Sequence, residues 1–236
     1  MAKYTAIVLA AGKGSRMGST VHKQYLMLAG RPVIYYALKA FADSPVDEIV
    51  LVTGEGEEEF CRKEVVERYG LQKITHITAG GRERYHSVYC GLQCCENSDY
   101  VLIHDGARPC VSREIISRSM EMVTKTGACI AAVPVKDTIK TADEDGVVQA
   151  TPDRSRLWGV QTPQTFAYPL IRSAYDRMLA EGAEEITDDA MAVERYSKVQ
   201  VHILEGSYRN LKITTPEDLQ MAELLMQNHK EEYRPV

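Results

Sequence analysis

Residues 9–26, LAAGKGSRMGSTVHKQYL, contain three glycines, two lysines, one arginine and no acid, and they directly follow a short apolar run. Glycines let backbone N–H groups approach a ligand closely and point at one place, as a chain of phosphate oxygens requires. Lys13, Arg16 and Lys23 add positive charge to the same segment. The combination favours an anionic ligand, and we predict a nucleotide.

The glycine spacing separates this loop from two familiar phosphate-binding motifs. Gly12, Gly14 and Gly18 give G-x-G-x-x-x-G, not the G-x-G-x-x-G of a dinucleotide site, and residues 32–42 contain no acid that could hold a ribose. No Gly-Lys-Ser/Thr closes the loop, as a Walker motif requires. What remains is a basic loop suited to a triphosphate whose developing charge must be neutralised, with a purely structural glycine turn as the alternative.

A second candidate site follows the apolar run VLIHD. Asp105 ends this run, and a carboxylate there suits Mg²⁺, which prefers a few hard oxygen ligands and shares itself with phosphate oxygens. Arg108 lies three residues on, and on its own it could equally pair with Asp105 or cap a helix. His104 lies inside the apolar run, so we expect a core histidine and not a base.

These residues are carried by alternating strand-like and helix-like stretches. Short apolar runs predict strands at Tyr4–Ala10, Glu48–Thr53, Ile74–Ala79, Tyr100–Asp105 and Cys129–Val135. Amphipathic stretches predict helices near 32–43, 57–69, 83–96 and 112–126. Because parallel strands need crossover connections, this order predicts an α/β fold, a Rossmann-like, mostly parallel sheet flanked by helices. Ligands in such sheets bind beyond the carboxyl ends of the strands.

The C-terminal third continues with helices near 168–181 and 188–196, a strand at Val199–Glu205 and a terminal helix. That last helix begins at Pro216, because proline suits the first helical position and Thr215 can cap the N-terminus ahead of it.

Residues 136–160 interrupt the alternation. Two short polar-apolar stretches surround the acidic turn DEDG, which predicts a projecting β-hairpin arm at about 136–160. The segment has too little apolar content to pack alone, so we expect it to lean on a partner subunit.

Composition limits the possible classes of function. The 236 residues suit a single domain, 1–236, with 44% hydrophobic and 26% charged residues. A net charge of −5 opposes general nucleic-acid binding, and no apolar run is long enough to suggest a membrane span. The start of the chain lacks a signal-peptide cleavage site, so we expect a cytoplasmic protein. Its six cysteines form no C-x-x-C pair, which favours buried thiols over a metal site at CGLQCC.

Five separated segments carry a family resemblance. They are LAAGKGSRMG followed by KQYL, HDGARP at 104–109, TPQTF at 162–166, ITDDAMAVE at 186–194 and NLKITTPEDL at 210–219. In this order and over nearly the whole chain, they resemble the 2-C-methyl-D-erythritol 4-phosphate cytidylyltransferases. The resemblance implies a reaction of CTP with methylerythritol 4-phosphate that gives the CDP-linked methylerythritol and pyrophosphate, a step of non-mevalonate isoprenoid precursor synthesis. It also implies a homodimer joined through the arm.

The resemblance assigns roles on the nucleotide side. Arg16 and Lys23 would stabilise the charge on the transferring phosphate and the leaving pyrophosphate, while Lys212 would contact the α-phosphate. The base and ribose would be held by a set of small residues: Ala10, Ala11, Gly12, Gly14, Gly80, Gly81 and Ser87. His22 stands where the family usually has proline. The loop backbone is therefore less restricted in conformation, but the Lys23 cation is retained.

The resemblance also places residues around the sugar phosphate: Asp105, Arg108, Thr138, Arg154, Thr162 and Thr187. Asp105 would in addition bind Mg²⁺, and Thr138 and Arg154 would reach in from the other subunit.

Three other functions stay open. Ribitol 5-phosphate cytidylyltransferases share the loop and KITTP, but typically differ where this chain has HDGARP and ITDDA. A uridylyltransferase is more distant. A catalytically silent nucleotide-binding regulator would have no need of Arg16, Lys23, Asp105 and Lys212 together.

Overall fold

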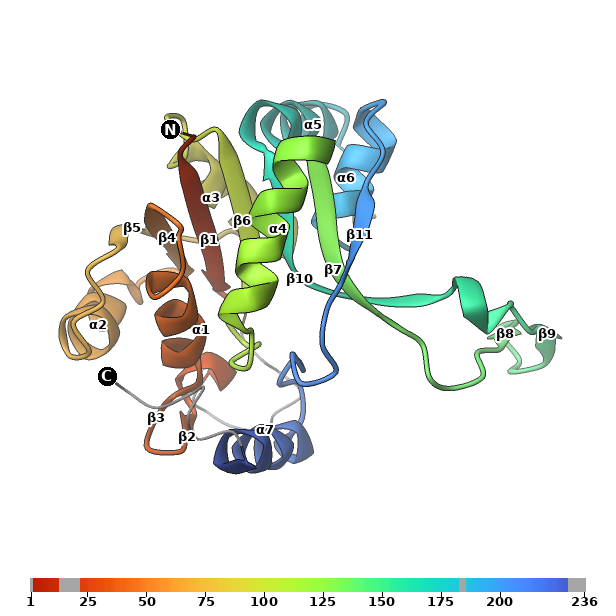
Figure 1. The fold of residues 1–236 in the computed structure, drawn as a ribbon, viewed down its shortest axis with the longest axis horizontal. Coiled ribbons are helices and arrows are strands. Elements are labelled where there is room, and N and C mark those ends of the chain that lie inside the picture. Colours follow the sequence, from red (N-terminus) through yellow and green to blue (C-terminus); the bar gives the residue numbers. More distant parts are fainter. Residues whose placement is uncertain (1, 13–21, 183–185, 229–236) are drawn as a thin grey trace.

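The computed structural model describes residues 2–12, 22–182 and 186–228, which are built around a seven-stranded sheet (Figure 1). The strand order is β11 (His202–Glu205), β7 (Ala128–Pro134), β10 (Trp158–Ala167), β6 (Tyr100–Asp105), β1 (Tyr4–Ala10), β4 (Glu48–Thr53) and β5 (Ile74–Ala79). All neighbouring strands pair in parallel except β10, which is antiparallel to both β6 and β7. The predicted mostly parallel α/β sheet is therefore confirmed.

Helices cover both faces of this sheet. One face is covered by α1 (Val33–Ala42), α2 (Glu58–Cys61), the π-helical turn η3 (Arg62–Glu67), α4 (Arg113–Thr126) and α7 (Pro216–Asn228). The other is covered by α3 (Arg84–Gln93), α5 (Tyr168–Ala180) and α6 (Asp189–Tyr196). Side chains of β1 alternate between the two cores, since Ala6 and Val8 pack on one face and Ile7 on the other.

Local capping explains where two of the helices begin. The Ser112 hydroxyl accepts a hydrogen bond from the backbone N–H of Ile115 at the start of α4 (3.2 Å). At the start of α7 the Thr215 hydroxyl accepts from the N–H of Asp218 (3.4 Å), which confirms the predicted cap.

The antiparallel strand β10 is absent from the sequence prediction. It contains Pro163, and a proline cannot donate to the ladder of a central strand, which argues against a strand in the sequence. The structure accommodates it where the register between β10 and β7 shifts, between Val160 and Gln164. The strand predicted at Val199–Glu205 is shorter and begins at His202. Two further short strands, β2 (Met27–Leu28) and β3 (Arg31–Pro32), form a small hairpin that we did not predict.

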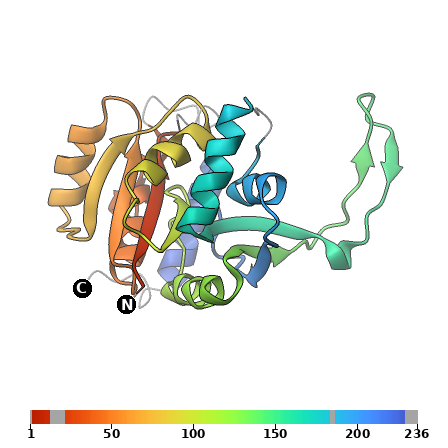
Figure 2. The same ribbon diagram turned by 90° about the horizontal axis from the view of Figure 1, so that it is seen from above.

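The predicted β-hairpin arm is present. Strands β8 (Thr141–Ala142) and β9 (Val148–Ala150) pair antiparallel, and the 3₁₀ turn η4 (Arg154–Arg156) leads back toward β10. Figures 1 and 2 show the arm extending away from the sheet in two perpendicular views. Its tip exposes Val147 and Val148, which are 58% and 56% accessible.

The six cysteines form no disulfide, and Cys61, Cys95, Cys110 and Cys129 are buried, as predicted for structural thiols. Within the described ranges, no helix combines the length and the apolar character needed to cross a membrane.

Candidate active site

A cleft of about 870 Å³ lies at the carboxyl ends of the parallel strands, where ligands of open α/β sheets bind. Its walls come from the segments that follow β1, β4, β5 and β6, together with the 3₁₀ turn η2 (Lys23–Tyr25) and the segment before α7. The cleft brings together predicted site residues from five parts of the chain: Ala10, Ala11, Gly12, Lys23, Gly80, Gly81, Ser87, Asp105 and Lys212. Gly14 and Arg16 lie outside the described residues.

Two glycines in the cleft wall have no room for a side chain. A Cβ on Gly80 would lie 2.6 Å from the Ala11 Cβ and from the Ser87 hydroxyl, and one on Gly81 would collide with His86. The Ser87 hydroxyl in turn accepts a hydrogen bond from the N–H of Gly81 (3.2 Å). Close packing of this turn against Ala11, Ser87 and His86 therefore requires glycine at both positions, and contact of GGRERYHS with a base or ribose stays a prediction.

Asp105 and Lys212 meet directly in this cleft. The Lys212 Nζ lies 2.7 Å from one Asp105 oxygen, and the Arg84 Nε donates to the other (3.2 Å). Burial alone would raise the pKa of the Asp105 carboxyl, but Arg84 and Lys212 outweigh burial and hold that pKa well below its usual range. Asp105 is therefore a carboxylate at neutral pH, flanked by two cations.

Arg84 links Asp105 to a buried acid that sequence reasoning did not assign to it. Its guanidinium donates to both carboxylate oxygens of Asp189, at 2.9 and 2.8 Å, and Asp189 is completely buried. The Tyr175 hydroxyl also donates to Asp189 (2.6 Å). Burial opposes the charge on Arg84, but Asp189 and Asp105 keep its pKa well above the usual value. A fixed cation thus lies between the cleft and the core.

The ITDDA segment is held from below by β10. Gln164 accepts from the N–H groups of Asp189 and Ala190 (both 3.0 Å) and donates to Asp188 (2.9 Å). Asp188 also caps α6 by accepting from the N–H of Met191 (3.0 Å). Thr187, directly before the cap, remains exposed.

His104 is the core histidine that the sequence predicts. It is fully buried, with Nδ1 3.0 Å from the Thr162 hydroxyl and Nε2 3.2 Å from the Arg108 carbonyl. The Thr162 oxygen accepts from the Asp105 N–H (3.1 Å), so its own proton points to Nδ1 and Nε2 carries the imidazole proton. Thr162 therefore supports Asp105 from beneath the cleft.

We expect His104 to make the free energy of unfolding depend on pH. Burial lowers the pKa of the imidazole from 6.5 to about 4. Between these values the unfolded chain binds more protons than the folded one, so the free energy of unfolding decreases as the pH is lowered, by up to about 1.4 kcal/mol per pH unit. Urea unfolding across this window checks the slope, which should be smaller in a His104→Gln variant. An unchanged slope would contradict the assignment.

Arg108 follows neither of the two structural alternatives raised by the sequence. Its guanidinium donates to the carbonyls of Asn210 (2.7 Å) and Val160 (3.5 Å). Burial lowers the pKa of this arginine. The bond to Asn210 ties HDGARP to the segment that carries Lys212. Contact of Arg108 with a substrate stays a prediction.

The two arm residues lie apart from the cleft of their own chain. Thr138 and Arg154 are exposed, and neither lines the cleft. Arg154 donates to the Lys136 carbonyl (2.8 Å) at the base of the arm. Their predicted role in the other subunit, like the substrate contacts of Thr162 and Thr187, stays a prediction.

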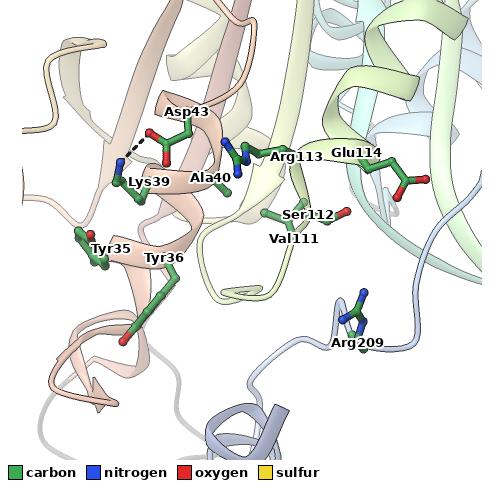
Figure 3. A pocket seen from close by; sticks show the side chains of 10 residues that line it. All are labelled: Tyr35, Tyr36, Lys39, Ala40, Asp43, Val111, Ser112, Arg113, Glu114 and Arg209. Carbon is green, nitrogen blue, oxygen red and sulfur yellow. Dashed lines mark hydrogen bonds and ion pairs between the residues drawn. The ribbon is translucent and has the colours of Figure 1, made fainter. Parts of the chain in front are cut away.

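A second cavity of about 250 Å³ lies between α1, the start of α4 and the loop before α7 (Figure 3). Its acids have partners, since Asp43 pairs with Lys39 (2.6 Å) and Glu114 with Arg118 (3.4 Å). None of the site residues predicted from the sequence lines it. We therefore assign the active site to the larger cleft.

Known proteins share this sequence over nearly its whole length. The family model for 2-C-methyl-D-erythritol 4-phosphate cytidylyltransferase matches residues 4–228. Proteins of that name from Lachnoclostridium phytofermentans and Lachnospira eligens are 46% and 50% identical to this chain, over 98% and 94% of it and 99% and 98% of their own lengths.

A solved structure supports the same relationship. The 4-diphosphocytidyl-2C-methyl-D-erythritol synthase of Anaerococcus prevotii superposes with a TM-score of 0.85, at 34% identity over 96% of each chain. With a family model over nearly its whole length, close relatives and the same fold, this chain belongs to the 2-C-methyl-D-erythritol 4-phosphate cytidylyltransferase family.

Proposed function

We propose that this chain transfers the cytidylyl group of CTP to 2-C-methyl-D-erythritol 4-phosphate, giving 4-diphosphocytidyl-2-C-methyl-D-erythritol and pyrophosphate in non-mevalonate isoprenoid precursor synthesis. The observation that carries the proposal is the contact of Asp105 with Lys212 and Arg84, in a glycine-walled cleft that Lys23 also lines. This is the charge arrangement that a nucleotide and a second phosphate require when they meet.

The reaction is an in-line displacement between two anions. A phosphate oxygen of methylerythritol 4-phosphate attacks the α-phosphorus of CTP, and the bond from that phosphorus to the β-phosphate bridging oxygen breaks. The attacking oxygen is already an anion at neutral pH, so no general base is needed. The barrier is the accumulated negative charge, and Lys23 and Lys212 lie in the cleft where they can neutralise it. Arg16, outside the described residues, would join them on the pyrophosphate side.

The donor set at Asp105 fits Mg²⁺. The described residues include no group of three or more His, Cys, Asp or Glu side chains that could hold a metal. Mg²⁺ commonly binds one carboxylate and takes its remaining ligands from phosphates and water, so Asp105 with a bound triphosphate would suffice. When bound, the ion would supply further neutralisation of phosphate charge.

We also propose that the enzyme is a cytoplasmic homodimer whose arms complete the sites. The outward reach of the arm, its exposed valines and the distance of Thr138 and Arg154 from their own cleft support an exchange of arms between subunits. Cysteines that form no disulfide suit a reducing compartment.

Mixing two inactive variants tests the shared site. Each mixed dimer of an Arg154→Ala chain with a Lys23→Ala chain would contain one site with both substitutions and one with neither. Random subunit exchange should therefore restore about a quarter of wild-type activity. The measurement is turnover before and after exchange, with mass spectrometry to confirm mixed dimers. Confirmed mixing without any recovery would show that the arm serves its own chain.

The preferred substrate separates the proposed activity from the ribitol 5-phosphate alternative. Both compounds carry a terminal phosphate on a short polyol, so Lys23, Lys212 and Asp105 would treat them alike. Discrimination between the two acceptors must come from the pocket that holds the polyol. A hydroxyl or polar group left without a hydrogen-bond partner there lowers the binding free energy far more than a missing methylene does. We expect kcat/KM to favour methylerythritol 4-phosphate by on the order of a hundredfold or more. A pyrophosphate-release assay measures this ratio. Equal use of the two compounds, or a preference for ribitol 5-phosphate, would overturn the assigned acceptor and leave cytidylyl transfer standing.

A further inference from the structure

The segment that carries Lys23 is fixed by its neighbours. Gln24 is 2% exposed, and its side-chain amide donates to the carbonyl of Ala10 at the end of β1. This bond attaches one side of the η2 turn to the central sheet. Lys23 itself is half-buried and lines the cleft.

Glu57 holds the two residues that flank the Lys23–Gln24 pair. One carboxylate oxygen lies 2.6 Å from the Nδ1 of His22. The other accepts from the Tyr25 hydroxyl (2.8 Å) and from the backbone N–H of Gly54 (3.1 Å), which directly follows β4. A single carboxylate therefore joins residues on both sides of Lys23 to the loop after β4.

The surroundings of Glu57 leave it little freedom. A Cβ on Gly54 would lie 2.7 Å from a Glu57 oxygen. The Tyr25 ring packs edge-on against Phe60 at 5.2 Å, and its hydroxyl lies 3.0 Å from the Cys61 sulfur. Burial and the adjacent Cys61 and Glu57 raise the pKa of Tyr25, so its hydroxyl keeps the proton that it donates to Glu57.

We propose that Glu57 is the positioning residue of Lys23. Lysine is a point charge on a flexible stem, so its effect on a transition state depends on a well-placed backbone. Glu57 contacts His22 and Tyr25 on the two sides of Lys23 and the N–H of Gly54 after β4, so its carboxylate acts through the Lys23 segment. The backbone at His22, with φ −60° and ψ 137°, is extended, and its imidazole lies against the Glu57 carboxylate. This inference rests on the proposed function.

The test compares Glu57→Ala with Glu59→Ala. Glu59 lies on α2 two residues on, its side chain is 67% exposed, and it pairs only with Arg62 and Lys63 among the ion pairs of the described residues. We expect Glu57→Ala to lower kcat by about tenfold to a hundredfold, with the KM for methylerythritol 4-phosphate within about threefold, because a displaced cation loses transition-state contact. Glu59→Ala should leave kcat within about twofold.

A double substitution separates positioning from a general structural role. In a Lys23→Ala background, Glu57→Ala should cost less than about twofold in kcat, because the cation it positions is gone. Glu57→Gln, which keeps one acceptor oxygen, should fall between wild type and Glu57→Ala. If the two losses multiply in the double variant, or if Glu57→Ala keeps wild-type kcat, Glu57 does not act through Lys23.

Two controls keep the result interpretable. Should Glu57→Ala fail to fold by circular dichroism, Tyr25→Phe removes one of the same bonds while keeping the ring packed on Phe60, and the same non-additivity with Lys23→Ala is expected. Backbone hydrogen exchange of residues 22–25 reports the local stability of this segment independently of enzyme activity. We expect this exchange to be faster in Glu57→Ala than in wild type. A wild-type chain that transfers no cytidylyl group would instead overturn the proposed function. Faster hydrogen exchange of residues 22–25 in Glu57→Ala would still show that Glu57 holds this segment.

Discussion

Replacing Lys23 by alanine is expected to lower kcat by about a hundredfold to a thousandfold, equivalent to roughly 3–4 kcal/mol of lost transition-state stabilisation. Lys23 lies on the cleft wall in a segment whose backbone is held by Gln24 and Glu57. Those contacts do not use the lysine ammonium, so they remain in the variant. The loss falls on kcat because charge on the phosphates grows as the bond to the leaving pyrophosphate breaks.

Steady-state pyrophosphate release measures this effect, with circular dichroism as the check on folding. Lys63→Ala is a matched control, because Lys63 is exposed and pairs only with the exposed Glu59 among the ion pairs of the described residues. Its turnover should equal that of wild type. Turnover of Lys23→Ala within threefold of wild type would remove Lys23 from the proposed mechanism.

The second large effect concerns the fold. Replacing Asp189 by alanine is expected to lower the free energy of unfolding by about 3–5 kcal/mol, because it leaves the buried side of the Arg84 guanidinium without its carboxylate. The Tyr175 hydroxyl, which is fully buried, loses its acceptor in the same variant. Urea denaturation followed by circular dichroism gives the value.

The chain contains a matched pair at its surface. Asp176 accepts from Arg172 (3.0 Å) and from the Tyr89 hydroxyl (2.8 Å), just as Asp189 accepts from Arg84 and Tyr175, but the Asp176 side chain is 46% exposed. Asp176→Ala should therefore cost less than about 1 kcal/mol. Equal costs for the two variants would mean that burial of the Arg84–Asp189 pair does not matter to stability.

The strands and the cleft could be predicted from sequence because their signals are local. Short apolar runs ended at Ala10, Thr53, Ala79 and Asp105, and each is the last residue of a parallel strand. Carboxyl ends of parallel strands meet at one edge, so residues just after them, such as Gly80 and Asp105, had to lie close together. The family motifs then added Lys23 and Lys212, which the same cleft contains.

Other parts of the site carry no local signal. Arg84 and Asp189 are separated by 105 positions, and both lie in polar stretches that read equally well as surface. Glu57 begins the acidic run EEEF, in which its neighbours Glu58 and Glu59 have the same local signature. The sequence did not predict strand β10 because Pro163 opposes a central strand, and in the structure the register with β7 shifts between Val160 and Gln164. In each of these examples the structure depends on contacts between residues far apart in the sequence.

We expect this cleft to join the cytidylyl group of CTP to methylerythritol 4-phosphate. The most direct measurement is the stoichiometry of products when the purified chain is incubated with both compounds and Mg²⁺, with pyrophosphate assayed enzymatically and cytidine products resolved by mass spectrometry. We predict one 4-diphosphocytidyl-2-C-methyl-D-erythritol for each pyrophosphate, and no pyrophosphate when the polyol phosphate is left out. Pyrophosphate released without the coupled product, or no reaction of a folded chain, would contradict the account.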